Sequence, residues 1–133
     1  MPTPTILIVE DNADLQKIYQ TVLTGDGYNV VVAGDGEAAL QQVAEYHPDL
    51  ILLDMLMVNL GGLEFLRAYR KTADADAKII IVSNLASPEL SQEAIKLGVD
   101  RYLAKTQLTP RELAREVKTI LAAPETPIAS AHQ

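Results

Sequence analysis

Short apolar runs rich in β-branched residues alternate along this chain with stretches of helical periodicity. A continuous apolar run is typical of a parallel strand that is covered on both faces. The runs are residues 5–9, 29–32, 49–53, 78–82 and, more weakly, 101–103. Successive βα units of this kind predict an α/β domain with right-handed crossovers. They are too few for an eight-stranded barrel, so the pattern favours an open, doubly wound parallel sheet.

The stretches between the runs carry signals for where helices begin. The predicted starts are Asn12, Asp35, the Gly61–Gly62 pair, Ser87 and Thr109. The last is the strongest, because Thr109 is followed by Pro110 and, three residues on, by Glu112, which together form a capping box. The predicted buried face of the first helix consists of Leu15, Ile18, Tyr19, Val22 and Leu23.

Length and charge limit the class of protein. A chain of 133 residues suits one domain with one core. A net charge of −7 gives no basic footprint for nucleic acid and argues against an anionic membrane surface, but it is compatible with a cation site or a basic partner. The absence of cysteine excludes disulfides and thiolate chemistry. The apolar runs are too short to span a bilayer, so we expect a cytoplasmic protein.

Ionisable and polar side chains follow the predicted strands at their carboxyl ends, where sites form in open parallel sheets. Glu10 and Asp11 follow the first strand, Asp54 the third, Ser83 the fourth and Lys105 the fifth. A carboxylate directly after a buried strand is costly unless a cation meets it. We therefore expect these side chains to converge at one edge of the sheet.

The chemistry of this set indicates a phosphate and a metal. Three neighbouring carboxylates repel one another unless a cation intervenes, and oxygen-only ligands favour a hard ion such as Mg²⁺. Lys105 supplies a further positive charge for a phosphoryl group, and Ser83 supplies a hydrogen-bond donor. Asp54 is placed to act as the nucleophile, since carboxylates form aspartyl phosphates.

Taken singly, each of these residues has a simpler explanation. Glu10 and Asp11 are acids at a helix N-terminus, Ser83 is a loop hydroxyl, and Lys105 is a solvated surface lysine. The joint occurrence of all of them at the predicted strand ends favours the functional interpretation.

Four stretches resemble the receiver domain of bacterial two-component response regulators, in its stand-alone, chemotaxis-regulator-like form. They are ILIVEDN, PDLILLDMLM, IIIVSN and YLAKT, and the resemblance runs over about residues 5–122. It implies a flavodoxin-like five-stranded sheet with strand order 2-1-3-4-5. It also implies a receiver domain over residues 1–122, followed by a flexible C-terminal tail or linker over residues 123–133.

The resemblance also assigns roles at the metal site. It implies that Asp54 accepts the phosphoryl group in a phosphorelay. It implies that Mg²⁺ is bound by Glu10, Asp11 and Asp54 together with the backbone carbonyl of Leu56.

Further roles concern the phosphoryl group and the switch. By resemblance, Ser83 moves to the phosphoryl group, Tyr102 turns inward behind it, and Lys105 pairs with the phosphoryl oxygens. Asn84 stands where the family usually has a small residue, which makes it a candidate phosphoryl contact.

The resemblance implies a signalling protein that catalyses only its own phosphorylation and dephosphorylation. Its expected partners are a sensor histidine kinase or phosphotransfer protein and a downstream protein that reads the surface of the fourth helix, fifth strand and fifth helix. No direct nucleic-acid or membrane contact is expected, and phosphorylation could produce a homodimer. Two alternatives stay open: a pseudo-receiver that only binds partners, and an aspartate-nucleophile, Mg²⁺-dependent phosphatase. The intact acidic pair, Asp54, Ser83 and Lys105 count against the first. The lack of a second general acid and of a cap-sized insertion counts against the other.

Overall fold

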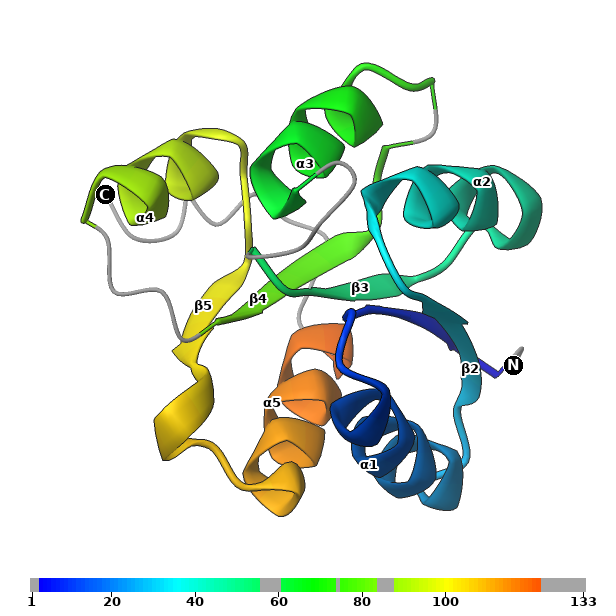
Figure 1. The fold of residues 1–133 in the computed structure, drawn as a ribbon. Coiled ribbons are helices and arrows are strands. Elements are labelled where there is room, and N and C mark those ends of the chain that lie inside the picture. The colour runs from blue at the N-terminus through cyan, green and yellow to red at the C-terminus, as the bar shows by residue number, and fades with distance from the viewer. Residues whose placement is uncertain (1–2, 56–60, 74, 84–87, 123–133) are drawn as a thin grey trace.

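The structure, a computed structural model, describes residues 3–55, 61–73, 75–83 and 88–122 (Figure 1). Several sequence-based predictions lie outside these residues. They are those for the Leu56 carbonyl, Asn84, the Ser87 cap and the tail over residues 123–133. No described helix is long and apolar enough to cross a membrane.

Five parallel strands form one sheet in the order β2-β1-β3-β4-β5, which confirms the predicted fold class. The strands are β1 (Thr5–Val9), β2 (Asn29–Ala33), β3 (Leu50–Leu53), β4 (Lys78–Ser83) and β5 (Arg101–Ala104). In the register, Val9 pairs with Leu53 of β3, and Leu53 pairs in turn with Ile81 of β4. The residues that follow Val9 and Leu53, Glu10 and Asp54, therefore leave the sheet side by side.

Five helices cover the two faces of the sheet. They are α1 (Ala13–Gly25), α2 (Gly36–Tyr46), α3 (Gly62–Arg70), α4 (Pro88–Lys96) and α5 (Pro110–Ala122), with a short 3-10 turn, η1, at Lys105–Gln107. Figure 1 shows α1 and α5 on one face and α2, α3 and α4 on the other. Each face buries its own apolar cluster, with alternate residues such as Ile6 and Leu7 of β1 pointing to opposite clusters. This two-sided burial explains why the strands are apolar without alternation.

Side-chain caps fix three helix starts where the sequence predicts them. Asn12 Oδ1 accepts a hydrogen bond from the Leu15 amide at 3.0 Å, and Asp35 Oδ1 accepts one from the Ala38 amide at 2.8 Å. The predicted capping box of α5 is present: the Thr109 amide donates to Glu112 Oε1 at 2.9 Å, and the Glu112 amide donates to Thr109 Oγ1 at 3.1 Å. These bonds satisfy amides that have no partner within the helix.

The prediction that Ile18 belongs to the buried face of the first helix was wrong. The buried side of α1 is centred on Tyr19 and Leu23, which lie one helical turn apart. Ile18 precedes Tyr19 by one residue and therefore faces a different side of the helix. Its side chain is 42% exposed.

Candidate functional site

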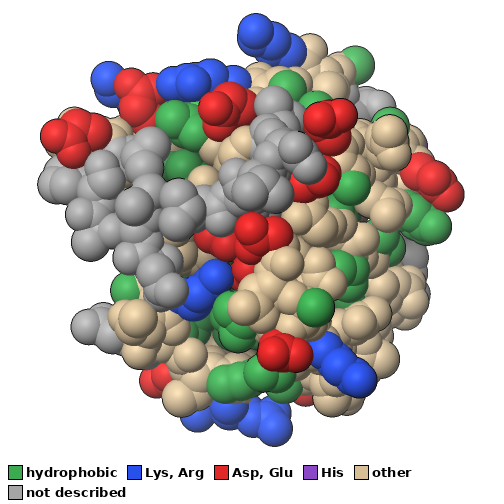
Figure 2. Space-filling view, viewed as in Figure 1, with side chains coloured by type: hydrophobic (Ala, Val, Ile, Leu, Met, Phe, Trp, Pro, Cys, Tyr) green, Lys and Arg blue, Asp and Glu red, His purple; other side chains and the backbone are tan. Residues whose placement is uncertain are grey.

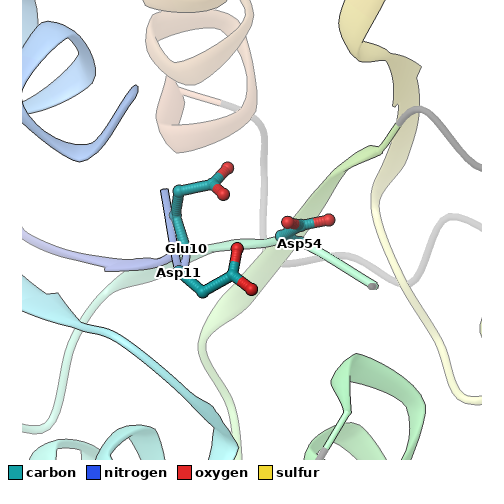
Figure 3. Close-up of side chains that lie close together, drawn as sticks. All are labelled: Glu10, Asp11 and Asp54. Carbon is teal, nitrogen blue, oxygen red and sulfur yellow. The ribbon is translucent and has the colours of Figure 1, made fainter. Parts of the chain in front are cut away.

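Three carboxylates meet at the carboxyl ends of β1 and β3. One oxygen from each of Glu10, Asp11 and Asp54 lies within 4.8 Å of the others (Figure 3). Glu10 and Asp54 are buried, whereas Asp11 is exposed and opens the group to solvent. Figure 2 shows acidic side chains gathered near the middle of this face of the molecule, with a basic side chain beside them. The parallel register brings these residues together, because it aligns the ends of neighbouring strands.

Lys105 joins the group from the end of β5. Its Nζ lies 2.8 Å from Glu10 Oε1 and 3.3 Å from Asp54 Oδ2, and its side chain is 13% exposed. Burial alone would lower the pKa of Lys105, but the hydrogen bond to Glu10 and the charge of Asp54 outweigh it and raise that pKa above its usual value. Lys105 therefore stays an ammonium ion and compensates part of the negative charge of both carboxylates.

Burial and hydrogen bonding act on Glu10 in opposite directions. Burial raises its pKa, and the hydrogen bonds from Lys105 and from the Asn12 amide lower it only in part, while the nearby Asp54 charge adds to the rise. The Asn12 amide donates to Glu10 Oε2 at 3.1 Å, and the Gln16 side-chain amide donates to the Glu10 carbonyl. A divalent cation bound beside Glu10 would favour its charged form, and the oxygen-only donor set fits a hard ion.

The structure also places two predicted switch residues near this edge. Ser83 is buried at the end of β4, paired in register with Ala104, the residue before Lys105. Tyr102 is half-buried on β5 opposite Ile81, and its side chain packs against the apolar cluster under α2, α3 and α4. Leu56 and Asn84, the remaining predicted contacts, lie outside the described residues.

Gly62 supports the site in a way that the sequence analysis missed. A Cβ at Gly62 would lie 2.6 Å from the carbonyl oxygen of Asp54 and 2.6 Å from the Cα of Met55. The Gly62 amide donates to the Met55 carbonyl at 3.2 Å. The start of α3 is thus seated directly on the backbone of Asp54. The pair of glycines signalled a helix start, but nothing in the sequence indicated this close approach.

Tyr19 also borders the site, although the sequence placed it only in the buried face of a helix. Its side chain is 5% exposed and lines a small cavity together with Glu10 and Asp54. Burial raises the pKa of Tyr19, and the neighbouring charges of Lys105, Glu10 and Asp54 also act on it. The one sequence signal for this position was that Tyr19 is a tyrosine among the otherwise aliphatic residues of the predicted buried face.

The sequence model of the response regulator receiver domain matches residues 6–118. This chain belongs to the response regulator receiver domain family. Solved structures agree: the receiver domain superimposes on chemotaxis protein CheY4 of Vibrio cholerae with a TM-score of 0.83 and 27% identity, covering 90% of this chain and 99% of that one.

Curated relatives of the receiver domain are longer proteins. The receiver domain is 33% identical over 121 residues to the probable transcriptional regulator ycf27 of Porphyridium aerugineum, and the match covers 91% of this chain and 49% of that protein. It is 34% identical over 116 residues to the DNA-binding response regulator MtrA of Mycobacterium tuberculosis, covering 87% of this chain and 50% of that protein. The receiver domain spans about half the length of these relatives. The expectation of no nucleic-acid contact does not fit relatives that are named as DNA-binding regulators. The match to these relatives is confined to about half of their length.

Proposed function

We propose that this receiver domain is a phosphoacceptor switch in which Asp54 takes a phosphoryl group in a Mg²⁺-dependent reaction. The observation that carries the proposal is the convergence of Glu10, Asp11 and Asp54 with the Lys105 ammonium group on two of them. Three carboxylates held together at one strand edge repel one another, and a bound cation would offset this cost.

The donor set supports magnesium as the cofactor. Glu10, Asp11 and Asp54 would hold the ion, with the Leu56 carbonyl as a further ligand. When bound, Mg²⁺ would neutralise the carboxylates and draw charge from the oxygens of an incoming phosphoryl group. The exposure of Asp11 supports an open route for the ion from solvent.

Asp54 is the proposed nucleophile. A carboxylate oxygen of Asp54 attacks phosphorus and forms a P–O bond, while the bond from phosphorus to the donor's leaving atom breaks and its electron pair goes to the leaving group. The product is an aspartyl phosphate. Burial of Asp54 beside Lys105 excludes bulk water from much of the carboxylate and strengthens the local electrostatics.

Three further side chains respond to the new group in this proposal. Lys105 moves its ammonium from Glu10 to a phosphoryl oxygen, Ser83 donates a hydrogen bond to another, and Tyr102 turns inward behind Ser83. Asn84 is the remaining candidate contact. Because Ser83 and Tyr102 lie on β4 and β5, these movements would shift the α4-β5-α5 surface between two packings.

The proposed role is signalling rather than substrate turnover. The phosphoryl donor is a sensor histidine kinase or a phosphotransfer protein, and the readout is altered affinity for a downstream protein or for a second copy of the domain. We further propose that residues 1–122 form the receiver domain, that residues 123–133 act as a tail or linker, and that the protein acts in the cytoplasm.

Intact-mass measurement tests the proposal. Incubation with MgCl₂ and acetyl phosphate should add one phosphoryl group to the wild type. Asp54→Asn or removal of Mg²⁺ by a chelator should abolish the addition. Turnover of a small phosphoester would favour a phosphatase instead, and absence of phosphorylation together with retained partner binding would favour a pseudo-receiver.

A further inference from the structure

Tyr19 borders the candidate site from α1. It lies on α1, on the face that packs with α5 against the sheet, and it contacts the same apolar cluster as Ile8, Leu52 and Val82. Tyr19 and the ends of β1 and β3 line a partly open hollow of about 10 Å³. Glu10 and Asp54 line the same hollow, so a tyrosine and two acidic residues border one small space.

This cavity is lined by both apolar and polar side chains. Its walls are aliphatic strand residues apart from Tyr19, Glu10 and Asp54. The volume is at the lower limit for one water molecule, and the three polar groups supply the two to four partners that a buried water needs. Within the described parts of the chain, no protein group accepts a hydrogen bond from the Tyr19 hydroxyl, which leaves this donor available to a water molecule.

We propose that Tyr19 is a positioning residue for the metal site, with its hydroxyl donating through one water molecule to the carboxylate of Glu10. This inference rests on the proposed function, since it gives Glu10 its orientation for Mg²⁺. Burial keeps the phenol protonated and therefore a donor at neutral pH, because it raises the pKa of Tyr19.

A second support for Glu10 is needed because its main partner is mobile in the proposed reaction. Glu10 Oε1 depends on Lys105, and Glu10 Oε2 depends on the Asn12 amide. When Lys105 turns to a phosphoryl oxygen, Glu10 loses its charge-assisted bond. The Tyr19 hydroxyl keeps the carboxylate in place during that exchange, while an aliphatic or phenyl group at residue 19 would leave it with the Asn12 amide alone.

Tyr19→Phe isolates the hydroxyl, because the ring still fills its place in the apolar cluster. Titration calorimetry should show Mg²⁺ binding about tenfold weaker than in the wild type, as is typical when a partner of a metal ligand is removed. Without metal, the two proteins should melt at the same temperature. Phosphorylation by acetyl phosphate should slow at low Mg²⁺ and recover at saturating Mg²⁺.

Tyr28→Phe is the matched control. Tyr28 is also partly buried against the α1–α5 cluster, but it lines a different hollow, with Asp26 and Arg115. Its loss of a hydroxyl should leave Mg²⁺ affinity unchanged. Unchanged Mg²⁺ affinity in Tyr19→Phe would overturn the inference, as would an equal weakening in Tyr28→Phe. A metal-free melt showing that Tyr19→Phe fails to fold would overturn it too, because the hydroxyl would then serve the fold.

The wild type separates the two proposals. If the wild type takes up neither Mg²⁺ nor a phosphoryl group, the proposed function fails. If the wild type takes up both and Tyr19→Phe matches it at every Mg²⁺ concentration, only the role of Tyr19 fails.

Discussion

Replacing Gly62 by alanine tests how tightly α3 is seated against the proposed phosphoacceptor. The new Cβ would meet the Asp54 carbonyl oxygen and the Met55 Cα, both at 2.6 Å, and the Met55 sulfur at 3.0 Å. Two of these three atoms belong to the backbone, so they cannot turn aside as a side chain can. Overpacking of this kind costs roughly 1–3 kcal/mol. The better helix propensity of alanine, about 1 kcal/mol in a helix interior, offsets only part of that cost because Gly62 is the first residue of α3.

The net loss of unfolding free energy in Gly62→Ala should be about 1–2 kcal/mol. Urea denaturation measures this loss, and the thermal midpoint should fall by roughly 4–8 °C. Because the displaced atoms include the backbone of Asp54, phosphorylation by acetyl phosphate should also slow several-fold at saturating Mg²⁺.

Gly61→Ala supplies the control for Gly62→Ala. Its Cβ would lie 2.8 Å from Glu64 Oε1, the end of a flexible exposed side chain, and its φ of −68° suits any residue. We expect a change within about 0.5 kcal/mol and an unchanged phosphorylation rate. Equal stability of the two variants would refute the close approach of α3 to Asp54.

Four other perturbations follow from contacts in the structure. Lys105→Met should bind Mg²⁺ several-fold more tightly by calorimetry, because Lys105 occupies Glu10 and Asp54 as a competing cation; weaker binding would contradict this. Arg70→Met should lose about 2 kcal/mol in urea denaturation, because the guanidinium donates to the carbonyls of Leu97, Gly98 and Ala75, at 2.8, 2.7 and 2.8 Å. Thr109→Ala should lose about 1 kcal/mol through the α5 cap. Hydrogen bonding from the Thr109 amide lowers the pKa of Glu112. The difference in unfolding free energy between wild type and Glu112→Gln should therefore be full above pH 4.5 and should close as the pH falls below it. A difference that persists at low pH would show that the carboxylate charge is not responsible.

The sequence predicts well those features that depend on local pattern. The capping box of Thr109 and Glu112 uses two residues within one helical turn, and its geometry follows once the helix begins there. The five apolar runs are nearly the observed strands, because a strand covered on both faces is apolar along its length, and the weakest run corresponds to β5, the least buried strand. The position of Asp54 follows in turn, since it comes directly after such a run.

Features that depend on distance across the fold were less accessible. Ile18 fits a helical stripe, yet whether that side of α1 is covered depends on where α5 lies. The convergence of Lys105 with Asp54 was expected, but its shorter contact with Glu10 depends on side-chain geometry. Gly62 and the cavity beside Tyr19 involve approaches of a few ångström between segments that sequence spacing does not relate.

The ion pair between Glu10 and Lys105 joins the end of β1 to the end of β5. A ribosome releases Glu10 early and Lys105 only after four further strands have emerged. Until then the acidic residues lack their ammonium partner, and an incomplete chain presents them without that compensation. Synthesis of the fifth strand is therefore the event that completes the proposed phosphoacceptor site, and a chain truncated before Lys105 would lack a working switch even with Asp54 in place.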